Sequence, residues 1–276
     1  MGLRITTNLP AINAQRNLIN SQRAIQTSSA QLASGSRITK SADDAAGLAI
    51  SENMKSQIRS SVQARRNAND GISLVQTAEG GLSETSNIIT RMRELAIQSA
   101  SDTVGAQERD MIDKEVQHLK AEVQRISDTT AWNTTKLLDG STPVFDFQVG
   151  LNATENDKIE FDSSTNVSTL DALGMTDLDY TQKETSRSAL LTLDAAQTQI
   201  NGMRANLGAL QNRLVSTADT LAVTEENLAA ANSRIRDTDV AASSTDMARN
   251  NLMLQAGTAT LAQANQNGQL ALKLIG

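Results

Sequence analysis

The sequence predicts a mainly α-helical protein, in which long heptad helices form a coiled-coil rod with a small β-hairpin region and paired terminal helices. Two observations indicate this fold. Apolar residues recur every seven positions along much of the chain, which is the repeat of coiled coils. The 276 residues include only five aromatics, two prolines and no cysteine. Aliphatic residues must therefore fill the core, and we expect that core to be a narrow seam rather than a thick centre.

The amino-terminal segment is the first element with a clear pattern. It carries large aliphatic residues at seven-residue steps: Ile5, Ile12 and Ile19, and separately Leu18, Ile25 and Leu32. Asn8 is a suitable N-cap, and Pro10 is tolerated in the first turn of a helix. The segment is predicted to form an amphipathic helix.

A helical hairpin is predicted near residues 44–128. Val75, Leu82, Ile89 and Ala96 repeat by sevens, and a shorter pattern follows over 112–126. The loop between these two helices is expected at 102–105. Gly80 and Gly81 lie inside the first helix, where each glycine costs up to about 1 kcal/mol relative to alanine. They indicate either a close helix–helix approach or a hinge, and we favour the close approach.

The clearest strand signal lies near 143–162. Phe145, Phe147 and Val149 alternate with polar residues, and Ile159 and Phe161 alternate again after a polar loop. Two such runs separated by a turn predict a β-hairpin.

The strongest heptad follows over 193–235, with a step of seven that predicts a coiled-coil helix roughly 65 Å long. Its members are Leu193, Ile200, Leu207, Leu214, Leu221, Leu228 and Ile235. A last helix is predicted beyond it, because the step of seven continues, with Gly268 at one position, through Val240, Met247, Leu254, Leu261 and Ile275.

The domain organisation follows from two interruptions of these patterns, at 34–47 and 236–239. We interpret them as paired linkers. Residues 1–43 plus 237–276 would then form one discontinuous domain of inner helices, and 44–236 would form a coiled-coil core domain that includes the hairpin.

The terminal helices are too poor in large apolar residues to offset the entropy of ordering them alone. We therefore expect them to pack on partners, including other copies of the chain. The residues predicted to mediate this assembly are Ile5, Ile12, Ile19, Ile25, Leu32, Val240, Met247, Leu254, Leu261 and Ile275.

Charge is distributed unevenly. Residues 1–70 carry nine Lys/Arg and four Asp/Glu, whereas 128–185 carry three Lys and eleven Asp/Glu. The arginines of the basic segment are dispersed, with no nearby aromatic to stack on bases. Solvated or subunit-facing charge therefore explains the segment better than nucleic-acid binding does.

Catalytic and metal-binding chemistry has little support in this sequence. His118 is the single histidine, there is no cysteine, and no nucleophile motif flanks the histidine. Asp43 and Asp44 could together bind a divalent cation, but the preference of helix N-termini for acidic residues explains them better. We expect no cofactor, no metal and no enzymatic activity.

Several motifs resemble those of bacterial flagellins. The N-terminal signature of that family is matched by the stretches 32–38, 42–50, 66–73, 76–80 and 93–100, and the C-terminal one by 230–239 and 263–266. The resemblance implies a short flagellin without large outer domains, which self-assembles into the helical tube of the flagellar filament and serves motility. A hook–filament junction protein is the alternative, because its ends are similar. An unrelated coiled-coil adaptor would lack the terminal signatures.

The resemblance also implies partners and a location. It predicts other copies of the chain, an export chaperone, and the filament cap and hook-junction proteins as partners. It implies secretion by the flagellar type III route to the flagellar filament. The first thirty residues contain no apolar run of signal-peptide length, and no segment approaches the roughly 18 apolar residues of a membrane span. We thus expect no cleaved signal, no membrane insertion and no nucleic-acid partner.

A further implication of the resemblance is recognition of the monomer by Toll-like receptor 5. Flagellins that activate this receptor share a pattern matched by Arg91, Leu95 and Glu115. Arg91 and Leu95 are four residues apart and share a helix face, which we place beside the apolar seam rather than inside it. The alternative is that these residues make only filament contacts.

Overall fold

The computed structural model describes residues 7–141 and 144–273, and the side chains up to residue 266. It consists of two compact units, one formed by residues 1–58 with 226–276 and the other by 59–225. Two long helices, α2 (Ala45–Ser99) and α4 (Lys183–Arg236), each contribute to both units. The mainly α-helical prediction is confirmed.

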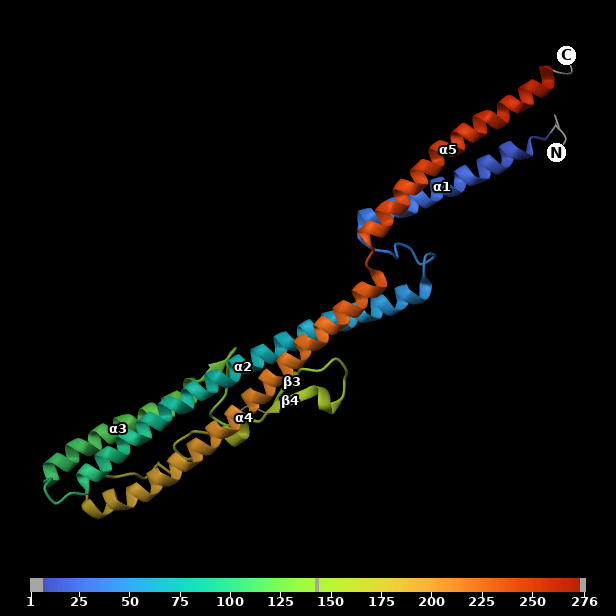
Figure 1. Cartoon of the computed structure of the whole chain (residues 1–276). Coiled ribbons are helices and arrows are strands. Elements are labelled where there is room, and N and C mark those ends of the chain that lie inside the picture. Colours follow the sequence, from blue (N-terminus) through green and yellow to red (C-terminus); the bar gives the residue numbers. More distant parts are fainter. Residues whose placement is uncertain (1–6, 142–143, 274–276) are drawn as a thin grey trace. The chain divides into compact units, whose positions relative to one another are not determined.

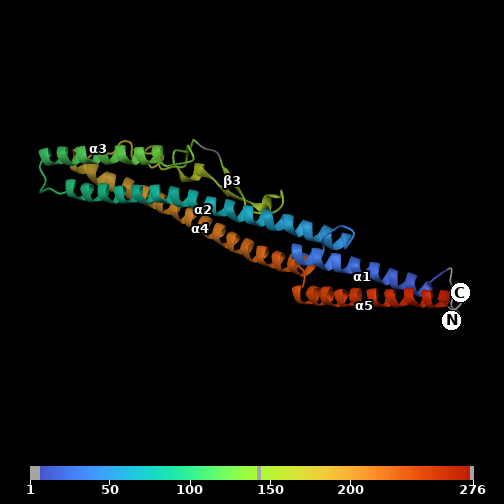
Figure 2. The ribbon, with the colours of Figure 1, turned by 90° about the horizontal axis from the view of Figure 1, so that it is seen from above.

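In the terminal unit, α1 (Leu9–Ser34) and α5 (Val240–Lys273) lie side by side (Figures 1 and 2). The predicted start of α1 is confirmed, because the Asn8 side chain accepts a hydrogen bond from the Ala11 amide at 3.2 Å. The same side chain donates to the Ala264 carbonyl at 2.9 Å. One residue thus caps α1 and ties it to α5.

The two connectors of this unit pair with each other, as the interruptions in the sequence predicted. Ser36 and Asp237 form an antiparallel bridge. The Arg37 amide donates to the Arg236 carbonyl at 2.6 Å, and the Thr238 amide donates to the Gly35 carbonyl at 3.0 Å. Gly35 ends α1 with a φ of 67°, a left-handed conformation that favours glycine.

Asp43 and Asp44 act in helix initiation. Asp44 accepts a hydrogen bond from the Gly47 amide at 2.8 Å, in the first turn of α2. Asp43 closes the preceding turn by accepting from the Lys40 and Thr39 amides. These hydrogen bonds lower the pKa of Asp43, and the bond from the Lys40 amide has the largest effect. The helix-terminus interpretation is thus confirmed for Asp44, whereas Asp43 belongs to the turn before the helix.

The second unit is a rod in which α2, α3 (Ala106–Thr129) and α4 share one core. The predicted heptads supply this core: Val75, Leu82, Ile89 and Ala96 on α2, and Leu193, Ile200, Leu207 and Leu214 on α4 are buried. The helical hairpin is confirmed, with its loop at 100–105. Figure 2 shows α3 folded back along α2, and α4 along the same pair.

The two adjacent glycines of α2 differ in their surroundings. A Cβ on Gly81 would lie 2.8 Å from the Leu138 Cδ1 and the Thr130 Oγ1, whereas a Cβ on Gly80 would meet nothing within 4 Å. Close packing therefore explains Gly81, as expected. The same explanation fails for Gly80, which faces open space.

The predicted β-hairpin is present, with β3 (Phe145–Gln148) antiparallel to β4 (Lys158–Phe161). The Phe145 and Phe161 ring centroids are 5.9 Å apart. A Cβ on Gly71 of α2 would lie 3.2 Å from the Phe147 ring, so the absence of a side chain there lets the hairpin approach the helix.

The sequence did not predict a second, two-residue hairpin, β1 (Ala131–Trp132) with β2 (Thr135–Lys136). Its turn residues Asn133 and Thr134 have φ values of 44° and 72°. Two successive positive φ angles define the turn that matches strand twist, but threonine is an unusual residue at such a position. Short 3-10 turns follow at Glu155–Asp157 and Ser163–Asn166.

The chain between the hairpin and α4 is fixed by buried polar groups, which the sequence also did not indicate. Lys120 of α3 is buried and donates to the Thr176 carbonyl at 2.6 Å. Tyr180 is fully buried, and its hydroxyl donates to the Met92 carbonyl at 3.2 Å. Burial raises the pKa of Tyr180, so the hydroxyl keeps its proton and remains a donor.

Candidate functional site

The helix pair α1–α5 leaves apolar side chains exposed after the two helices have packed together. Ile12 and Ile19 of α1 are 46% and 43% exposed, and Val240 at the start of α5 is 61% exposed. The contact itself uses other residues: a Cβ on Gly257 of α5 would lie 2.8 Å from the Leu18 Cδ2. The residues at the contact between the two helices thus differ from the apolar residues that the pair leaves exposed.

Eight of the ten predicted assembly residues are described by the structure, and they differ in exposure. Ile12, Ile19 and Val240 face outward. The half-buried members are Ile25, Leu32, Met247, Leu254 and Leu261. Ile5 and Ile275 lie outside the described residues. The outward members therefore keep about half of their surface exposed within one subunit.

Three further apolar residues of this helix pair are exposed and do not belong to the seven-residue patterns: Leu9, Leu252 and Met253, with exposed fractions of 55%, 66% and 57%. A signal for two of them was present, because Leu252, Met253 and Leu254 are consecutive. A helix with three consecutive large apolar residues is apolar on more than one face. A single seven-residue register describes one face and therefore overlooks the others.

On the rod unit, the structure brings Arg91 and Glu115 together. The Arg91 Nη2 donates to the Glu115 Oε1 at 2.9 Å, and its Nη1 donates to the Glu94 Oε2 at 3.0 Å. All three side chains are about half exposed. The hydrogen bonds that Arg91 donates to Glu94 and, second, to Glu115 raise the pKa of Arg91. A charged cluster therefore joins α2 and α3 at the surface.

The predicted position of Leu95 is wrong. It is only 2% exposed and belongs to the core, rather than lying beside the seam. The reason is that α2 packs against both α3 and α4, so its apolar face is wider than the seam of a two-helix coiled coil. A residue next to the heptad positions is therefore buried as well.

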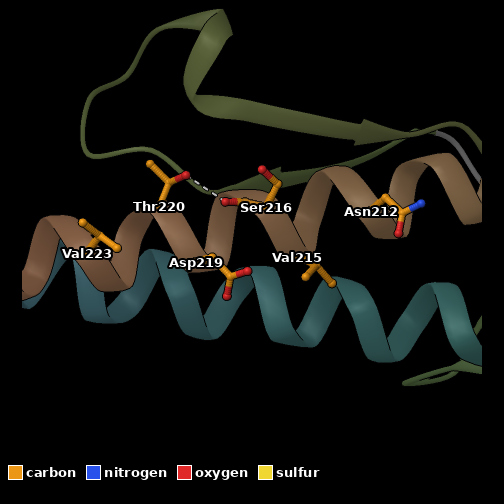
Figure 3. Close-up of a pocket in the computed structure, with 6 residues that line it drawn as sticks. All are labelled: Asn212, Val215, Ser216, Asp219, Thr220 and Val223. Carbon is orange, nitrogen blue, oxygen red and sulfur yellow. Dashed lines mark hydrogen bonds between the residues drawn. The ribbon is translucent and has the colours of Figure 1, made fainter.

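A shallow groove of about 470 Å³ lies on the surface of α4 (Figure 3). One face of this helix lines it, through Asn212, Val215, Ser216, Asp219, Thr220 and Val223. Val215 and Val223 are 41% and 58% exposed. Asp219 is exposed between them and makes no ion pair within the described residues.

His118 is exposed on α3, and no group of three or more candidate metal-ligating side chains occurs within 7–141 and 144–273. Across the part of the chain that the structure describes, no helix combines the length and apolarity needed to cross a membrane.

Comparison with known proteins places these features in a family. Residues 5–142 match the family described as the bacterial flagellin N-terminal helical region, and residues 190–275 match the bacterial flagellin C-terminal helical region. The intervening 143–189 contain the β3–β4 hairpin, the chain that leads from it to α4, and the first residues of α4. The matched regions thus cover α1, α2, α3 and α5 and most of α4.

Relatives align along the whole chain. A flagellin of Halalkalibacterium halodurans is 44% identical, over 98% of this chain and 99% of its own. The flagellar filament 33 kDa core protein of Treponema phagedenis is 41% identical over the same shares. A Bacillus subtilis flagellin is 39% identical, over 99% of this chain and 100% of its own. The crystal structure of Bacillus cereus flagellin aligns with a TM-score of 0.51 and 28% identity, covering 56% of this chain and 88% of that one.

Proposed function

Since this chain belongs to the bacterial flagellin family, we propose that it assembles by burying the outward apolar residues of α1 and α5 against neighbouring copies. The chain is a short flagellin, a structural subunit of the flagellar filament that serves motility. The relatives named above are flagellins or filament core proteins, which favours this function over a hook–filament junction protein.

The observation that carries the assembly proposal is the exposure of Ile12, Ile19 and Val240 after α1 and α5 have paired. Apolar surface removed from water contributes about 25 cal/mol per Å², and a filament repeats that contribution at every subunit. The ten residues from Ile5 to Ile275 named above are the proposed contacts. The eight of them that the structure describes extend along both helices, which suits a continuous inner layer of packed helices.

The experiment is a seeded polymerisation assay followed by electron microscopy. Deleting 258–276 should abolish filaments while the rod helices keep their circular dichroism signal. A matched pair of variants sharpens it: Ile19→Ser should raise the critical concentration, whereas Arg16→Ser, an exposed polar change on the same helix, should leave it within about twofold. Normal filaments from the truncated chain would contradict the proposal.

We also propose that the domain boundaries lie at 43/44 and 236/237, at the paired connectors, and that the terminal helices become stably folded only on assembly. A segment that buries too little apolar surface alone can fold when a partner covers it. Limited proteolysis of the monomer should trim both ends towards a fragment near 44–236, and filaments should resist it. Equal protection of monomer and filament would argue against coupled folding.

For export, we propose the flagellar type III route without a cleaved signal peptide, with the amino-terminal segment as the export signal. A cytoplasmic chaperone would cover α5 until secretion, because Leu252 and Met253 are exposed apolar residues and such patches promote aggregation. The filament cap and the hook-junction proteins are the proposed partners at the two ends of the filament. Removing residues 2–40 should stop secretion, and persistent secretion would refute the export signal.

We propose that the monomer activates Toll-like receptor 5 through Arg91 and Glu115, with Leu95 supporting them from the core. Their exposed charged cluster can form paired hydrogen bonds with a receptor carboxylate. Arg91→Ala should reduce signalling in a reporter-cell assay, whereas Lys114→Ala, a change at the exposed residue before Glu115 on α3, should not. Equal signalling by both variants would count against the proposal. The signalling of Leu95→Ala should be compared with the stability of that variant, because removing the buried side chain leaves a cavity.

We propose further that the chain has no enzymatic activity, cofactor or metal of its own. It belongs to a structural family, and its one histidine, His118, is exposed. Purified monomer should show no hydrolase activity on peptide or ester substrates, with or without added Zn²⁺.

A further inference from the structure

We infer that the outward face of α1 in the free monomer binds the surface of an anionic phospholipid bilayer, on which the helix lies without crossing it. The inference goes beyond the proposed filament function, because it concerns the subunit before assembly. Three observations carry it: basic and apolar side chains share one stripe of α1, α5 leaves that stripe uncovered, and no acidic residue occurs in the amino-terminal part of the chain.

The outward stripe of α1 consists of five residues that recur every three or four positions: Leu9, Ile12, Arg16, Ile19 and Arg23. At 100° per residue they fall within a sector of about 80° on one side of the helix. All five side chains are exposed. Apolar and basic side chains therefore project from the same side of α1.

The opposite side of α1 packs along α5 (Figure 2). Leu18 is at this contact, because its Cδ2 lies 2.8 Å from the position of a Cβ on Gly257, and Ser28 is buried. Every member of the outward stripe lies about 100–180° around the helix from both Leu18 and Ser28. The stripe is therefore not covered by α5 within one subunit.

The two arginines of the stripe are available to a partner. Neither the Arg16 nor the Arg23 guanidinium makes an ion pair or a side-chain hydrogen bond within 7–141 and 144–273. The first 42 residues carry five Lys/Arg and no Asp/Glu, although the whole chain has a net charge of -6. A surface of this charge attracts anions.

An anionic bilayer accommodates both kinds of side chain in the stripe. Basic amphipathic helices lie in the bilayer surface with their apolar side chains at the boundary between head groups and acyl chains. The stems of arginine side chains lie along apolar surface, while the guanidinium groups hydrogen-bond to phosphate. Nucleic acid would satisfy only the arginines, because α1 contains no aromatic residue that could stack on bases.

The other helix of the pair, α5, exposes apolar residues without the same charge. Leu252 and Met253 are exposed. Arg249 is the one basic residue of 240–266, and Asp246 offsets its charge. The surface of α5 thus offers matched controls, namely an exposed arginine and exposed apolar residues outside the stripe.

The test measures co-flotation of the full-length monomer with lipid vesicles. Vesicles of equimolar phosphatidylglycerol and phosphatidylcholine should bind the monomer at least roughly tenfold more tightly than phosphatidylcholine vesicles, and added salt should weaken the binding. Arg16→Glu should weaken binding to the anionic vesicles roughly tenfold, because a repulsion replaces an attraction. Arg249→Glu makes the same change in net charge on α5 and should stay within about twofold, because salt screens a charge that lies away from the bilayer.

A second pair of variants tests the apolar half of the stripe. The double variant Ile12→Ser/Ile19→Ser should weaken binding to the anionic vesicles at least roughly tenfold, whereas Leu252→Ser/Met253→Ser on α5 should not. Circular dichroism of each variant checks that the rod helices are folded.

Equal binding to the neutral and the anionic vesicles would overturn the inference, as would equal effects of Arg16→Glu and Arg249→Glu. So would normal binding by the Ile12→Ser/Ile19→Ser variant, or tighter binding of the monomer to duplex DNA than to the anionic vesicles. Seeded polymerisation is measured separately, so a monomer that forms filaments but does not bind the vesicles refutes this inference and leaves the filament function intact.

Discussion

Gly80 and Gly81 are adjacent in α2, and alanine at the two positions should change stability in opposite directions. Each substitution removes the helix penalty of glycine, about 1 kcal/mol. At Gly80 the new methyl group meets nothing within 4 Å, so the full gain of about 1 kcal/mol should appear. The same gain at Gly81 is opposed by contacts of 2.8 Å with the Leu138 and Thr130 side chains.

Neither neighbour of Gly81 can move freely. Leu138 is fully buried, and the Thr130 hydroxyl donates to the Ile126 carbonyl at 2.7 Å. Overpacking of this kind typically costs 1–3 kcal/mol, so Gly81→Ala should be destabilised by roughly 0–2 kcal/mol overall. The propensity gain cancels between the two variants, and their difference therefore isolates the contact at about 1–3 kcal/mol.

The assay is urea denaturation of the unpolymerised protein, followed by circular dichroism, with a thermal melt as a second measurement. For a domain of this size the two variants should differ by at least about 2 °C in Tm. Gly80→Ala should lie above wild type and Gly81→Ala at or below it. Equal stabilisation of both variants would refute the idea that Gly81 is required for close packing.

Three other outcomes follow from individual contacts. Ile200→Ala should cost about 2–5 kcal/mol, since the side chain is fully buried in α4 and a cavity remains, whereas Leu191→Ala, 76% exposed on the same helix, should stay within about 0.5 kcal/mol on denaturation. Asp44→Ala should cost about 0.5–2 kcal/mol by removing the cap of α2, visible as a lower urea midpoint. Hydrogen bonding to Lys183 lowers the pKa of Asp102 in the folded state. The stability that Asp102 contributes is therefore fully present above the pKa of Asp102 in the unfolded chain, and it is lost as pH falls through the lower pKa of the folded state. Asp102→Asn should thus weaken the pH dependence of stability below about pH 4.

The sequence by itself determined the helices, their register and their connection order. A step of seven from Leu193 to Leu221 specifies one buried stripe, because residues seven apart in a helix return to nearly the same face. Alternating Phe145, Phe147 and Ile159 specify a strand pair in the same way. The cap residues Asn8 and Asp44 were readable too, since capping uses a side chain and amides only three residues away.

Only the tertiary structure decided what lies between these elements. Leu95 is buried because α2 packs against two helices. The pattern along a single helix does not indicate how many helices pack against it. The Lys120 and Tyr180 hydrogen bonds join carbonyls and side chains 56 and 88 residues apart, so no local signal marks them. Gly80 and Gly81 are the same residue type and differ only in the atoms that surround them.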